Sequence, residues 1–469
     1  MDAETVRGCV VVAGLGLSGT AAARGLARGG ERVVVLEQRE RPIPEILSEL
    51  GVEVRFGEQD LPARTELVVT SPGWKPDHPL LRAAASAGVE VIGEVELAWR
   101  LRHEGAAPWL ALTGTNGKTT AVRMLTSMLA AAGERALAVG NVGVPIVDAV
   151  LDPGETTVLA VELSSFQLHW SASPAPKAAA ILNVAPDHID WHGSLEEYAR
   201  AKARIFAKAE RVIYNADDPW AARLAEPYRA KGDGRSVGWT LGVPRAGQLG
   251  VVEDLLVDRA FTGDPMRSAE ELAALSDVHP FAPHNVANAL AAAALARSHG
   301  VPASAVRQGL ADFRPDPHRI AHVARVGEVD YVDDSKATNP HAAAASLAAY
   351  PSIVWIAGGQ LKGADVEDLV RRAAPRLRGA VLLGVDRERI AEALARHAAN
   401  VPVLEVAGDD TGVMDRVVTA AARLASPGDT VLLAPAGASL DMFPGYGARG
   451  EAFARAVRNL TGLTGLVER

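Results

Sequence analysis

Residues 113–120 of this 469-residue chain read TGTNGKTT, and this short stretch decides the fold of the middle of the protein. An apolar run, residues 109–112, precedes it, and a helical pattern follows from about residue 121. In a strand–loop–helix unit of this type, backbone N–H groups enclose phosphates, the lysine reaches the β- and γ-phosphates, and a threonine hydroxyl ligates Mg²⁺. A strict phosphate loop has glycine where this chain has Leu112, but the remainder is intact. We therefore predict an ATP site formed by Gly114, Thr115, Asn116, Gly117, Lys118, Thr119 and Thr120, with Lys118 catalytic and Thr119 on the metal.

Short β-rich runs alternate with helical patterns on both sides of this loop, which is typical of parallel α/β units. The expected strands are residues 10–13, 32–36, 67–70, 109–112, 158–161, 179–182, 212–214, 329–332, 353–357, 380–383, 402–406 and 430–433. Residues 104–108 and 315–317 have the composition of linkers. We predict three α/β domains: a Rossmann-like domain over residues 1–105, a phosphate-loop ATPase-like domain over 106–316, and a second Rossmann-like domain over 317–469.

The composition limits the class of protein. A hydrophobic share of 48% and a charged share of 22% are ordinary for globular chains, and about 150 residues per domain gives about three domains. The formal net charge of −9 argues against a nucleic-acid-binding surface. With one cysteine, Cys9, no intrachain disulfide can form, which fits a reducing compartment. The polar start MDAETVRG and the absence of a long uncharged apolar run predict a cytoplasmic protein without membrane insertion.

A second glycine motif, GLGLSG at residues 14–19, follows the first expected strand, and Glu37 ends the second. The pattern matches a dinucleotide fingerprint, in which glycines let the backbone approach a diphosphate at a helix N-terminus. Any nucleotide diphosphate could satisfy it, and tight packing alone would also favour these glycines. Ser71, Pro72 and Gly73 end another strand, at the edge where doubly wound sheets bind ligands.

Three further residues downstream of the phosphate loop are candidates for the chemistry. Glu162 follows a strand, where an acidic side chain is a natural Mg²⁺ ligand, although it also suits a helix start. His188 follows the next strand and is a candidate metal ligand, although a lone histidine is more often structural. From spacing alone, Lys202 is a surface lysine.

Taken together, several strings resemble the Mur ligase family, whose members add amino acids to a UDP-linked muramoyl precursor. The matching strings are GLGLSG, SPG, TGTNGKTT, GNVG, ELSSFQL, LNVAPDHID, AKARIF, HNVANAL, PHR, DDSKATN, GGQLKGAD and SLDMFPGYGARGEAF, and they cover essentially the whole chain. They are most similar to the family members that add D-glutamate. The resemblance implies an ATP-dependent ligase of peptidoglycan precursor synthesis that acts through an acyl phosphate, as a monomer.

The resemblance assigns the first domain to the UDP end of the precursor, UDP-N-acetylmuramoyl-L-alanine, instead of a dinucleotide. The implied contacts are Gly14, Leu15, Gly16, Leu17, Ser18, Gly19, Glu37, Gln38, Ser71, Pro72, Gly73 and Asn141. It also implies two Mg²⁺ ions and a carbamate on Lys202, which would act with Glu162 and His188 as catalytic and metal-binding groups. Additional contacts to ATP are implied for Asn285, His318, Arg319 and Asp334.

The resemblance implies a D-glutamate site in the third domain. Its residues are Lys336, Thr338, Lys362, Ser439, Leu440 and Tyr446. Cations and hydroxyls suit a substrate with two carboxylates. Tyr446 stands where the family usually has phenylalanine, and Ala434 and Gly437 also depart from its pattern.

Three rival hypotheses remain on the sequence. A nicotinamide dehydrogenase would explain residues 14–19 and Glu37 but gives Lys118 no role. A folylpolyglutamate-type ligase would share the second and third domains without needing the first. A regulatory phosphate-loop ATPase would bind nucleotide without ligation, and it leaves the cluster in the third domain unexplained.

Overall fold

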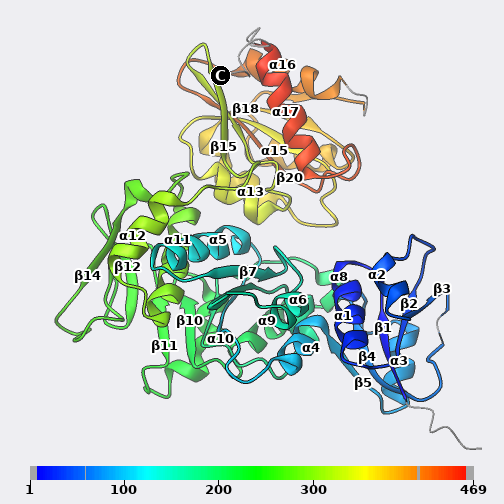
Figure 1. The fold of residues 1–469 in the computed structure, drawn as a ribbon. Coiled ribbons are helices and arrows are strands. Elements are labelled where there is room, and N and C mark those ends of the chain that lie inside the picture. The colour runs from blue at the N-terminus through cyan, green and yellow to red at the C-terminus, as the bar shows by residue number, and fades with distance from the viewer. Residues whose placement is uncertain (1–7, 59, 409–411, 461–469) are drawn as a thin grey trace, which may run out of the picture. The chain divides into compact units, whose positions relative to one another are not determined.

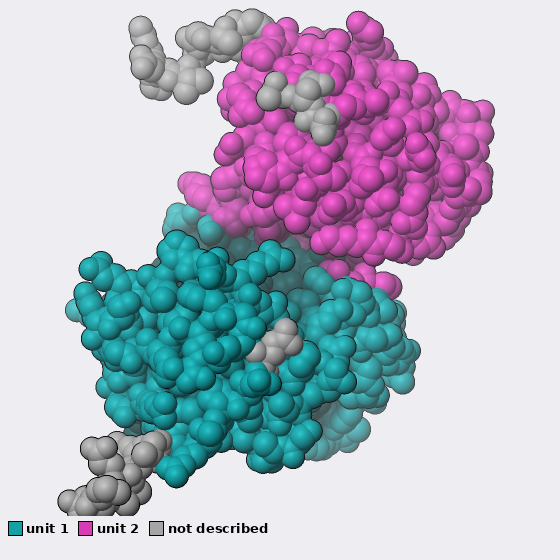
Figure 2. All heavy atoms as spheres, turned by 90° about the vertical axis from the view of Figure 1, so that its right-hand side faces the viewer, with its two compact units in different colours: residues 1–184, 188–274, 287–312 teal, residues 185–187, 275–286, 313–469 magenta. Residues whose placement is uncertain are grey.

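The computed structural model describes residues 8–58, 60–408 and 412–460, and it contains three α/β sheets in chain order (Figure 1). The polar start of the chain, residues 1–7, lies outside the described residues. The three-domain α/β fold class predicted from the sequence is confirmed. By packing, the chain forms two compact units (Figure 2): one comprises residues 1–184, 188–274 and 287–312, and the other residues 185–187, 275–286 and 313–469. The boundaries near residues 105 and 316 stay predictions.

The first sheet is entirely parallel, with strand order β3-β2-β1-β4-β5. The elements are β1 (Cys9–Ala13), α1 (Leu17–Arg28), β2 (Val33–Glu37), α2 (Glu45–Glu49), β3 (Glu53–Phe56), β4 (Thr65–Thr70), α3 (Pro79–Ser86), β5 (Glu90–Gly93) and α4 (Glu94–Leu101). Strand β1 is buried along its whole length, as expected for a central strand covered on both faces. The single cysteine, Cys9, lies in it as a buried free thiol.

The second sheet has nine strands in the order β14-β13-β12-β11-β10-β9-β6-β8-β7. The first part comprises β6 (Trp109–Thr113), α5 (Lys118–Ala131), β7 (Ala136–Gly140), α6 (Ile146–Leu151), β8 (Val158–Glu162), α7 (Ser165–His169), β9 (Ala178–Ile181), α8 (Ile189–His192), α9 (Leu195–Ala203) and β10 (Arg211–Asn215). The rest comprises α10 (Pro219–Arg229), β11 (Ser236–Trp239), β12 (Gln248–Val252), β13 (Leu255–Asp258), β14 (Glu270–Ala274), α11 (Pro283–His299) and α12 (Ala303–Asp312). Strands β12, β13 and β14 pair in antiparallel fashion, so they form an antiparallel extension of an otherwise parallel sheet.

The third sheet has the order β15-β16-β20-β17-β18-β19, and it is parallel apart from the β15–β16 pair. Its elements are β15 (Ala321–Val326), β16 (Val329–Asp333), α13 (Pro340–Leu347), β17 (Ile353–Gly358), α14 (Glu367–Ala373), β18 (Leu377–Leu383), α15 (Arg387–His397), β19 (Val403–Glu405), α16 (Val413–Leu424), β20 (Thr430–Ala436) and α17 (Tyr446–Leu460). Buried aliphatic side chains cover both faces of this sheet.

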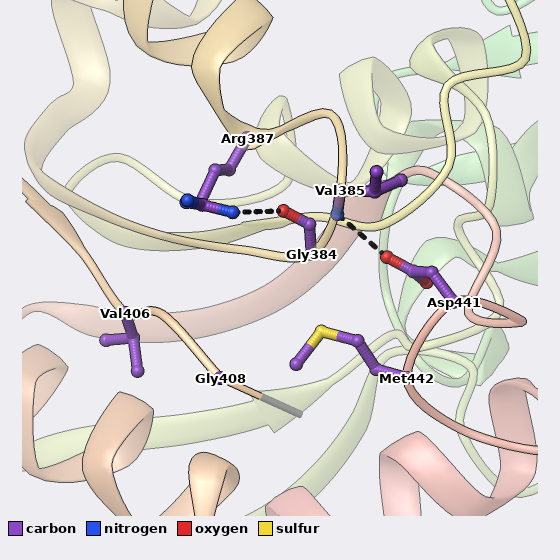
Figure 3. A pocket seen from close by; sticks show the side chains of 7 residues that line it. All are labelled: Gly384, Val385, Arg387, Val406, Gly408, Asp441 and Met442. Carbon is purple, nitrogen blue, oxygen red and sulfur yellow. Dashed lines mark hydrogen bonds between the residues drawn. The ribbon is translucent and has the colours of Figure 1, made fainter. Parts of the chain in front are cut away.

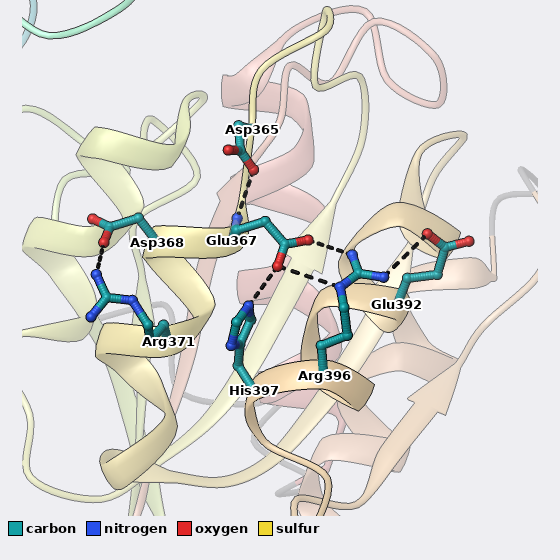
Figure 4. A network of polar contacts seen from close by, with 7 residues as sticks. All are labelled: Asp365, Glu367, Asp368, Arg371, Glu392, Arg396 and His397. Carbon is teal, nitrogen blue, oxygen red and sulfur yellow. Dashed lines mark hydrogen bonds and ion pairs between the residues drawn. The ribbon is translucent and has the colours of Figure 1, made fainter.

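Helices α14 and α15 of the third sheet are joined by a network of charges at the surface (Figure 4). Glu367 accepts hydrogen bonds from Arg396 and His397, and the hydrogen bond from Arg396, followed by that from His397, lowers the pKa of this carboxyl. Because the network is solvated, its ion pairs contribute little to stability.

Candidate active site

The phosphate loop connects β6, which lies between β9 and β8 in the second sheet, to α5, and the sequence predicts this strand–loop–helix order. The helix begins at Lys118, three residues earlier than expected, with Gly117 as its N-cap at φ +83°. This left-handed conformation favours glycine. A side chain at Gly117 would also meet the Asn288 side chain, because a Cβ there would lie 2.3 Å from Asn288 Oδ1. The loop therefore presents its N–H groups at a helix N-terminus, where phosphate binds well.

An asparagine on the neighbouring strand end supports the loop. The backbone N–H of Asn116 donates to Asn183 Oδ1 at 2.9 Å, and Asn183 Nδ2 donates back to the Asn116 carbonyl at 3.1 Å. Sequence reasoning did not identify Asn183 or Asn288 as site residues. For Asn183 a signal existed, since an amide side chain directly follows a strand beside the phosphate loop.

Two lysines converge on one carbonyl oxygen of the loop. Lys118 Nζ and Lys202 Nζ each donate to the Gly114 carbonyl at 2.9 Å, and Lys118 also donates to Thr115 at 3.0 Å. Lys202 is only 1% exposed, and its ammonium lies 4.5 Å from the centre of the Tyr198 ring. The interpretation of Lys202 as a surface lysine, drawn from spacing alone, is therefore wrong. Helix α9 carries it into the interior beside the loop.

Glu162 ends β8 next to the loop strand and is 1% exposed. Its neighbour Leu163 donates its N–H to Leu112 at 2.9 Å, which fixes the two strand ends side by side. Glu162 Oε1 accepts from Asn141 Nδ2 at 2.8 Å, whereas Oε2 is buried without a hydrogen-bond partner. A buried carboxylate oxygen of this kind requires a partner such as water or a cation, so Glu162 fits a Mg²⁺ ligand.

His188 precedes helix α8 in a left-handed conformation, φ +52°. Its ring lies 4.7 Å from the Phe166 ring and 6.4 Å from that of Tyr198, which also faces Lys202. Among the described residues, no three His, Cys, Asp or Glu side chains form a metal-binding group. A Mg²⁺ site needs few protein ligands, because phosphates and water complete its coordination.

The first glycine motif forms a tight turn that Glu37 closes. Glu37 Oε2 accepts the N–H of Leu15 at 2.8 Å, while Oε1 accepts that of Gln38 at 2.8 Å. A Cβ on Gly19 would lie 1.9 Å from the Gly14 carbonyl, so only glycine fits there.

Beside this turn, two features are consistent with a ligand site. The Ser71 hydroxyl is buried without a partner, and a Cβ on Gly14 would lie 2.7 Å from it. Leu17, which opens α1, is 84% exposed. Pro72 and Gly73 follow Ser71 in the loop after β4, and Gly16 lies within the glycine turn. The side chains of Gln38 and His78 form a hydrogen bond of 2.7 Å between their Nε2 atoms.

The remaining residues predicted to contact ATP belong to the other compact unit. His318 Nδ1 lies 2.6 Å from Asp333 Oδ2, and Arg319 pairs with Asp316 at 3.8 Å. Asp334 is buried, accepts hydrogen bonds from Ser346 and from the N–H of Ile320, and burial raises its pKa to about 6. Asn285, on α11, donates to the Pro280 carbonyl at 2.9 Å.

The residues predicted to bind D-glutamate come from three loops of the third sheet. Lys336 Nζ lies 3.7 Å from the centre of the Tyr446 ring. Lys362 is exposed with φ +51°, and its loop pairs with that of Ser439 through Gln360 and Ala438. Thr338 is half-buried, Ser439 is buried, and Leu440 is 64% exposed.

A buried arginine that sequence reasoning missed holds these loops together. Arg449 is 2% exposed and donates to the Ser335 carbonyl at 2.9 Å and the Gly437 carbonyl at 3.1 Å. Burial lowers the pKa of its guanidinium to about 10. Ser335 Oγ in turn donates to the Tyr446 carbonyl at 2.7 Å, so Arg449 fixes the backbone around Lys336 and Tyr446.

A cavity of about 260 Å³ lies near the ends of β18 and β19 (Figure 3). Arg387 and Asp441 line it, bonded to Gly384 and to the N–H of Val385. None of the predicted D-glutamate residues lines this cavity, although Asp441 directly follows Leu440.

In the described part of the chain, no helix is long and apolar enough to cross a bilayer.

Comparison with known proteins gives matches along the chain. Residues 8–93 match the Mur ligase MurD-like N-terminal domain, residues 112–296 the Mur ligase middle domain, and residues 318–437 the Mur ligase glutamate ligase domain. A UDP-N-acetylmuramoylalanine--D-glutamate ligase of Thermobifida fusca is 64% identical over 97% of this chain and 98% of its own, and one of Streptomyces avermitilis is 59% identical over 96% and 98%.

Solved structures share the fold at low identity. A UDP-N-acetylmuramate-alanine ligase of Thermotoga maritima has a TM-score of 0.57 at 19% identity, covering 97% of this chain and 100% of its own. A pseudomurein peptide ligase of Methanothermus fervidus has a TM-score of 0.58 at 17% identity, with the same coverage. Three matched domains in this order, with whole-length relatives at high identity, exclude the dehydrogenase and regulatory ATPase hypotheses. The chain belongs to the Mur ligase family.

Proposed function

We propose that this protein is an ATP-dependent ligase that joins D-glutamate to UDP-N-acetylmuramoyl-L-alanine in peptidoglycan precursor synthesis. The observation that carries the proposal is the meeting of the phosphate loop, the half-unpaired Glu162 carboxylate and the buried Lys202 at one edge of the second sheet. The relatives at 59–64% identity, which are named for this reaction, support the choice of substrates.

ATP would bind with its phosphates on residues 114–120. Lys118 donates to carbonyls of its own loop, and it would turn to the β- and γ-phosphates when ATP binds. Such charge-assisted hydrogen bonds are worth about 1.5–3 kcal/mol each. Asn285, His318, Arg319 and Asp334 would complete the nucleotide site.

Thr119, Glu162, His188 and a carbamate on Lys202 would hold two Mg²⁺ ions, which would offset the negative charge that builds on the transferred phosphoryl group. Lys202 is 1% exposed, and its ammonium meets that of Lys118 at the Gly114 carbonyl. A carbamate on Lys202 would replace this second cation with an anion that can ligate Mg²⁺.

The UDP end of the precursor would bind the turn at residues 14–19, where Ser71 offers an unpaired hydroxyl. Its L-alanine carboxylate would reach the second sheet near Asn141. D-Glutamate would bind Lys336, Thr338, Lys362, Ser439 and Leu440, and the cation–π contact between Lys336 and Tyr446 would orient the lysine. The extra hydroxyl of Tyr446 does not prevent this contact.

The reaction would proceed in two steps. A carboxylate oxygen of the L-alanine attacks the γ-phosphorus of ATP, the bond to the bridging oxygen breaks, and ADP leaves. Lys118 stabilises the charge on the transferred group. The D-glutamate amine then attacks the acyl carbon, loses a proton, and expels phosphate from a tetrahedral intermediate. No protein nucleophile is needed. We place the reaction in the cytoplasm, in a monomer.

The substrate assignment predicts which amino acid drives phosphate release. With ATP, Mg²⁺ and UDP-N-acetylmuramoyl-L-alanine present, adding D-glutamate is expected to start phosphate release, because the acyl phosphate needs its amine. L-Glutamate, L-alanine and diaminopimelate serve as controls. Phosphate release that does not depend on D-glutamate would contradict the proposal, and so would phosphate release that diaminopimelate drives equally well.

The role of Lys118 predicts that Lys118→Ala lowers kcat at least about 100-fold, since removal of one donor to a developing charge typically costs about 2.7–4 kcal/mol. Steady-state phosphate release measures this, and the apparent Tm serves as a folding check. The exposed Lys208→Ala, on the turn after Phe206, is the matched control. Turnover of Lys118→Ala at the wild-type rate would contradict the assignment of the loop.

The proposed carbamate predicts that the enzyme incorporates CO₂ at one buried lysine. Incubation with ¹³C-bicarbonate is expected to give one protein carbamate resonance by NMR, and removal of CO₂ is expected to reduce activity reversibly. Lys202→Ala should lack both the resonance and the dependence of activity on bicarbonate. Persistence of the resonance in that variant would rule out Lys202 as its site.

A further inference from the structure

Two acidic residues in the first turn of α4, Glu94 and Glu96, are buried, with exposures of 2% and 1%. Acidic side chains in a first turn usually stabilise their own helix from the solvent. Here Glu96 faces the segment after α7, and Glu94 faces both the first glycine motif and the start of α6, within the same compact unit. No step of the proposed reaction uses either residue.

Glu96 has a complete set of partners. Its Oε2 accepts the backbone N–H groups of Ala172 and Ser173 at 2.8 Å each, and Arg100 Nε donates to Oε1 at 2.9 Å. The carboxylate therefore fastens α4 to the segment after α7. A role in stability accounts for Glu96.

Glu94 lies in a different environment, between the first glycine motif, which is assigned to the precursor, and the start of α6. The donors that face it are the hydroxyl of Ser18, in the first glycine motif, and the N–H groups of Ile146 and Val147, at the start of α6. None of them makes a hydrogen bond of normal geometry, since both oxygens of Glu94 are buried without one. Burial raises the pKa of this carboxyl, and the three donors oppose that shift. Glu94 therefore differs from Glu96, whose oxygens have hydrogen-bond partners.

Helices α4 and α6 lie side by side, and both contact α1 (Figure 1). A Cβ on Gly25 of α1 would lie 2.8 Å from Leu151 Cδ1 and 3.0 Å from Val147 Cγ1, both on α6. Arg24 of α1 also pairs with Asp148 of α6 at 2.5 Å. Because α1 begins within the glycine motif, its contact with α6 fixes the position of that motif against the second sheet.

The loop before α6 leads to the site of phosphoryl transfer. Asn141 lies five residues before Ile146, and it bonds Glu162 twice: through its side chain to Oε1 and through its N–H to the carbonyl, both at 2.8 Å. Glu94 therefore lies between Ser18 and the start of α6, and the loop before α6 carries Asn141, which bonds Glu162.

We propose that Glu94 is a positioning residue that sets the separation between the glycine turn at residues 14–19 and the Asn141–Glu162 pair. This inference rests on the proposed function, in which one substrate spans both segments: its diphosphate lies on the turn and its carboxylate lies near Asn141. Misplacing one segment against the other weakens the productive placement of that substrate and leaves the phosphate loop unaffected.

The test compares Glu94→Gln with Glu96→Gln, two isosteric changes on the same turn of the same helix. In Glu94→Gln an amide N–H₂ group faces donors, and kcat/KM for UDP-N-acetylmuramoyl-L-alanine is expected to fall about tenfold, while KM for ATP stays within about twofold. Glu96→Gln is expected to lower the apparent Tm. It is expected to leave the ratio of kcat/KM for the precursor to kcat/KM for ATP unchanged. The exposed Glu31→Gln is the second control.

A double-mutant cycle tests whether Glu94 acts through the glycine turn. Because Ser18 and Glu94 face each other, their effects on kcat/KM for the precursor should be less than additive in Ser18→Ala/Glu94→Gln. The inference would be overturned if Glu94→Gln lowered kcat/KM equally for the precursor and for ATP. It would also be overturned if the loss in Glu94→Gln were explained by a lower Tm, as expected for Glu96→Gln.

The experiments also distinguish a failure of the inference about Glu94 from a failure of the proposed function. If Glu94→Gln does not fold, Glu94→Asp, which keeps the charge but is one methylene shorter, is expected to show the same selective loss, and wild-type kinetics in it would refute the inference. Absence of D-glutamate-dependent phosphate release in the wild type would refute the proposed function instead, whereas unchanged kinetics in Glu94→Gln alone refute only the role of Glu94.

Discussion

The Gly114 carbonyl accepts hydrogen bonds from the ammonium groups of Lys118 and Lys202, and the rest of the site depends on this interaction. Two cations thus meet at one carbonyl oxygen, and one of them, Lys202, is buried. Two neighbouring ammonium groups favour the binding of anions at this position. The proposed function supplies them as the phosphates of ATP and as a carbamate on Lys202 itself.

The second sheet makes this convergence possible, because its parallel strands end at a common edge. Strand β6 ends in the phosphate loop, its neighbour β8 ends in Glu162, β9 leads to Asn183, and β7 leads to Asn141. Neighbouring strand ends of a parallel sheet lie about 5 Å apart, so side chains distant in sequence meet there. The candidate site residues of the second sheet follow largely from this topology.

Much of this could be predicted from the sequence, because the signals are local. Apolar runs gave the strands, glycine patterns gave the two turns, and Glu162 was identified by its place after a strand. The contact of Asn288 with Gly117, the burial of Lys202 and the role of Arg449 depend on packing between segments far apart in the chain. Glu94 was missed for the same reason, since a glutamate at a helix start normally suits its own helix.

The central claim is that ATP activates a carboxylate of the bound precursor by phosphorylation. The most direct measurement uses UDP-N-acetylmuramoyl-L-alanine with ¹⁸O in the L-alanine carboxylate and follows the label by mass spectrometry of the released phosphate. The account predicts one ¹⁸O atom per phosphate, because the carboxylate oxygen that attacks the γ-phosphorus leaves with it when the amine displaces the phosphate. Phosphate free of ¹⁸O, with the label retained in the amide product and water, would contradict it.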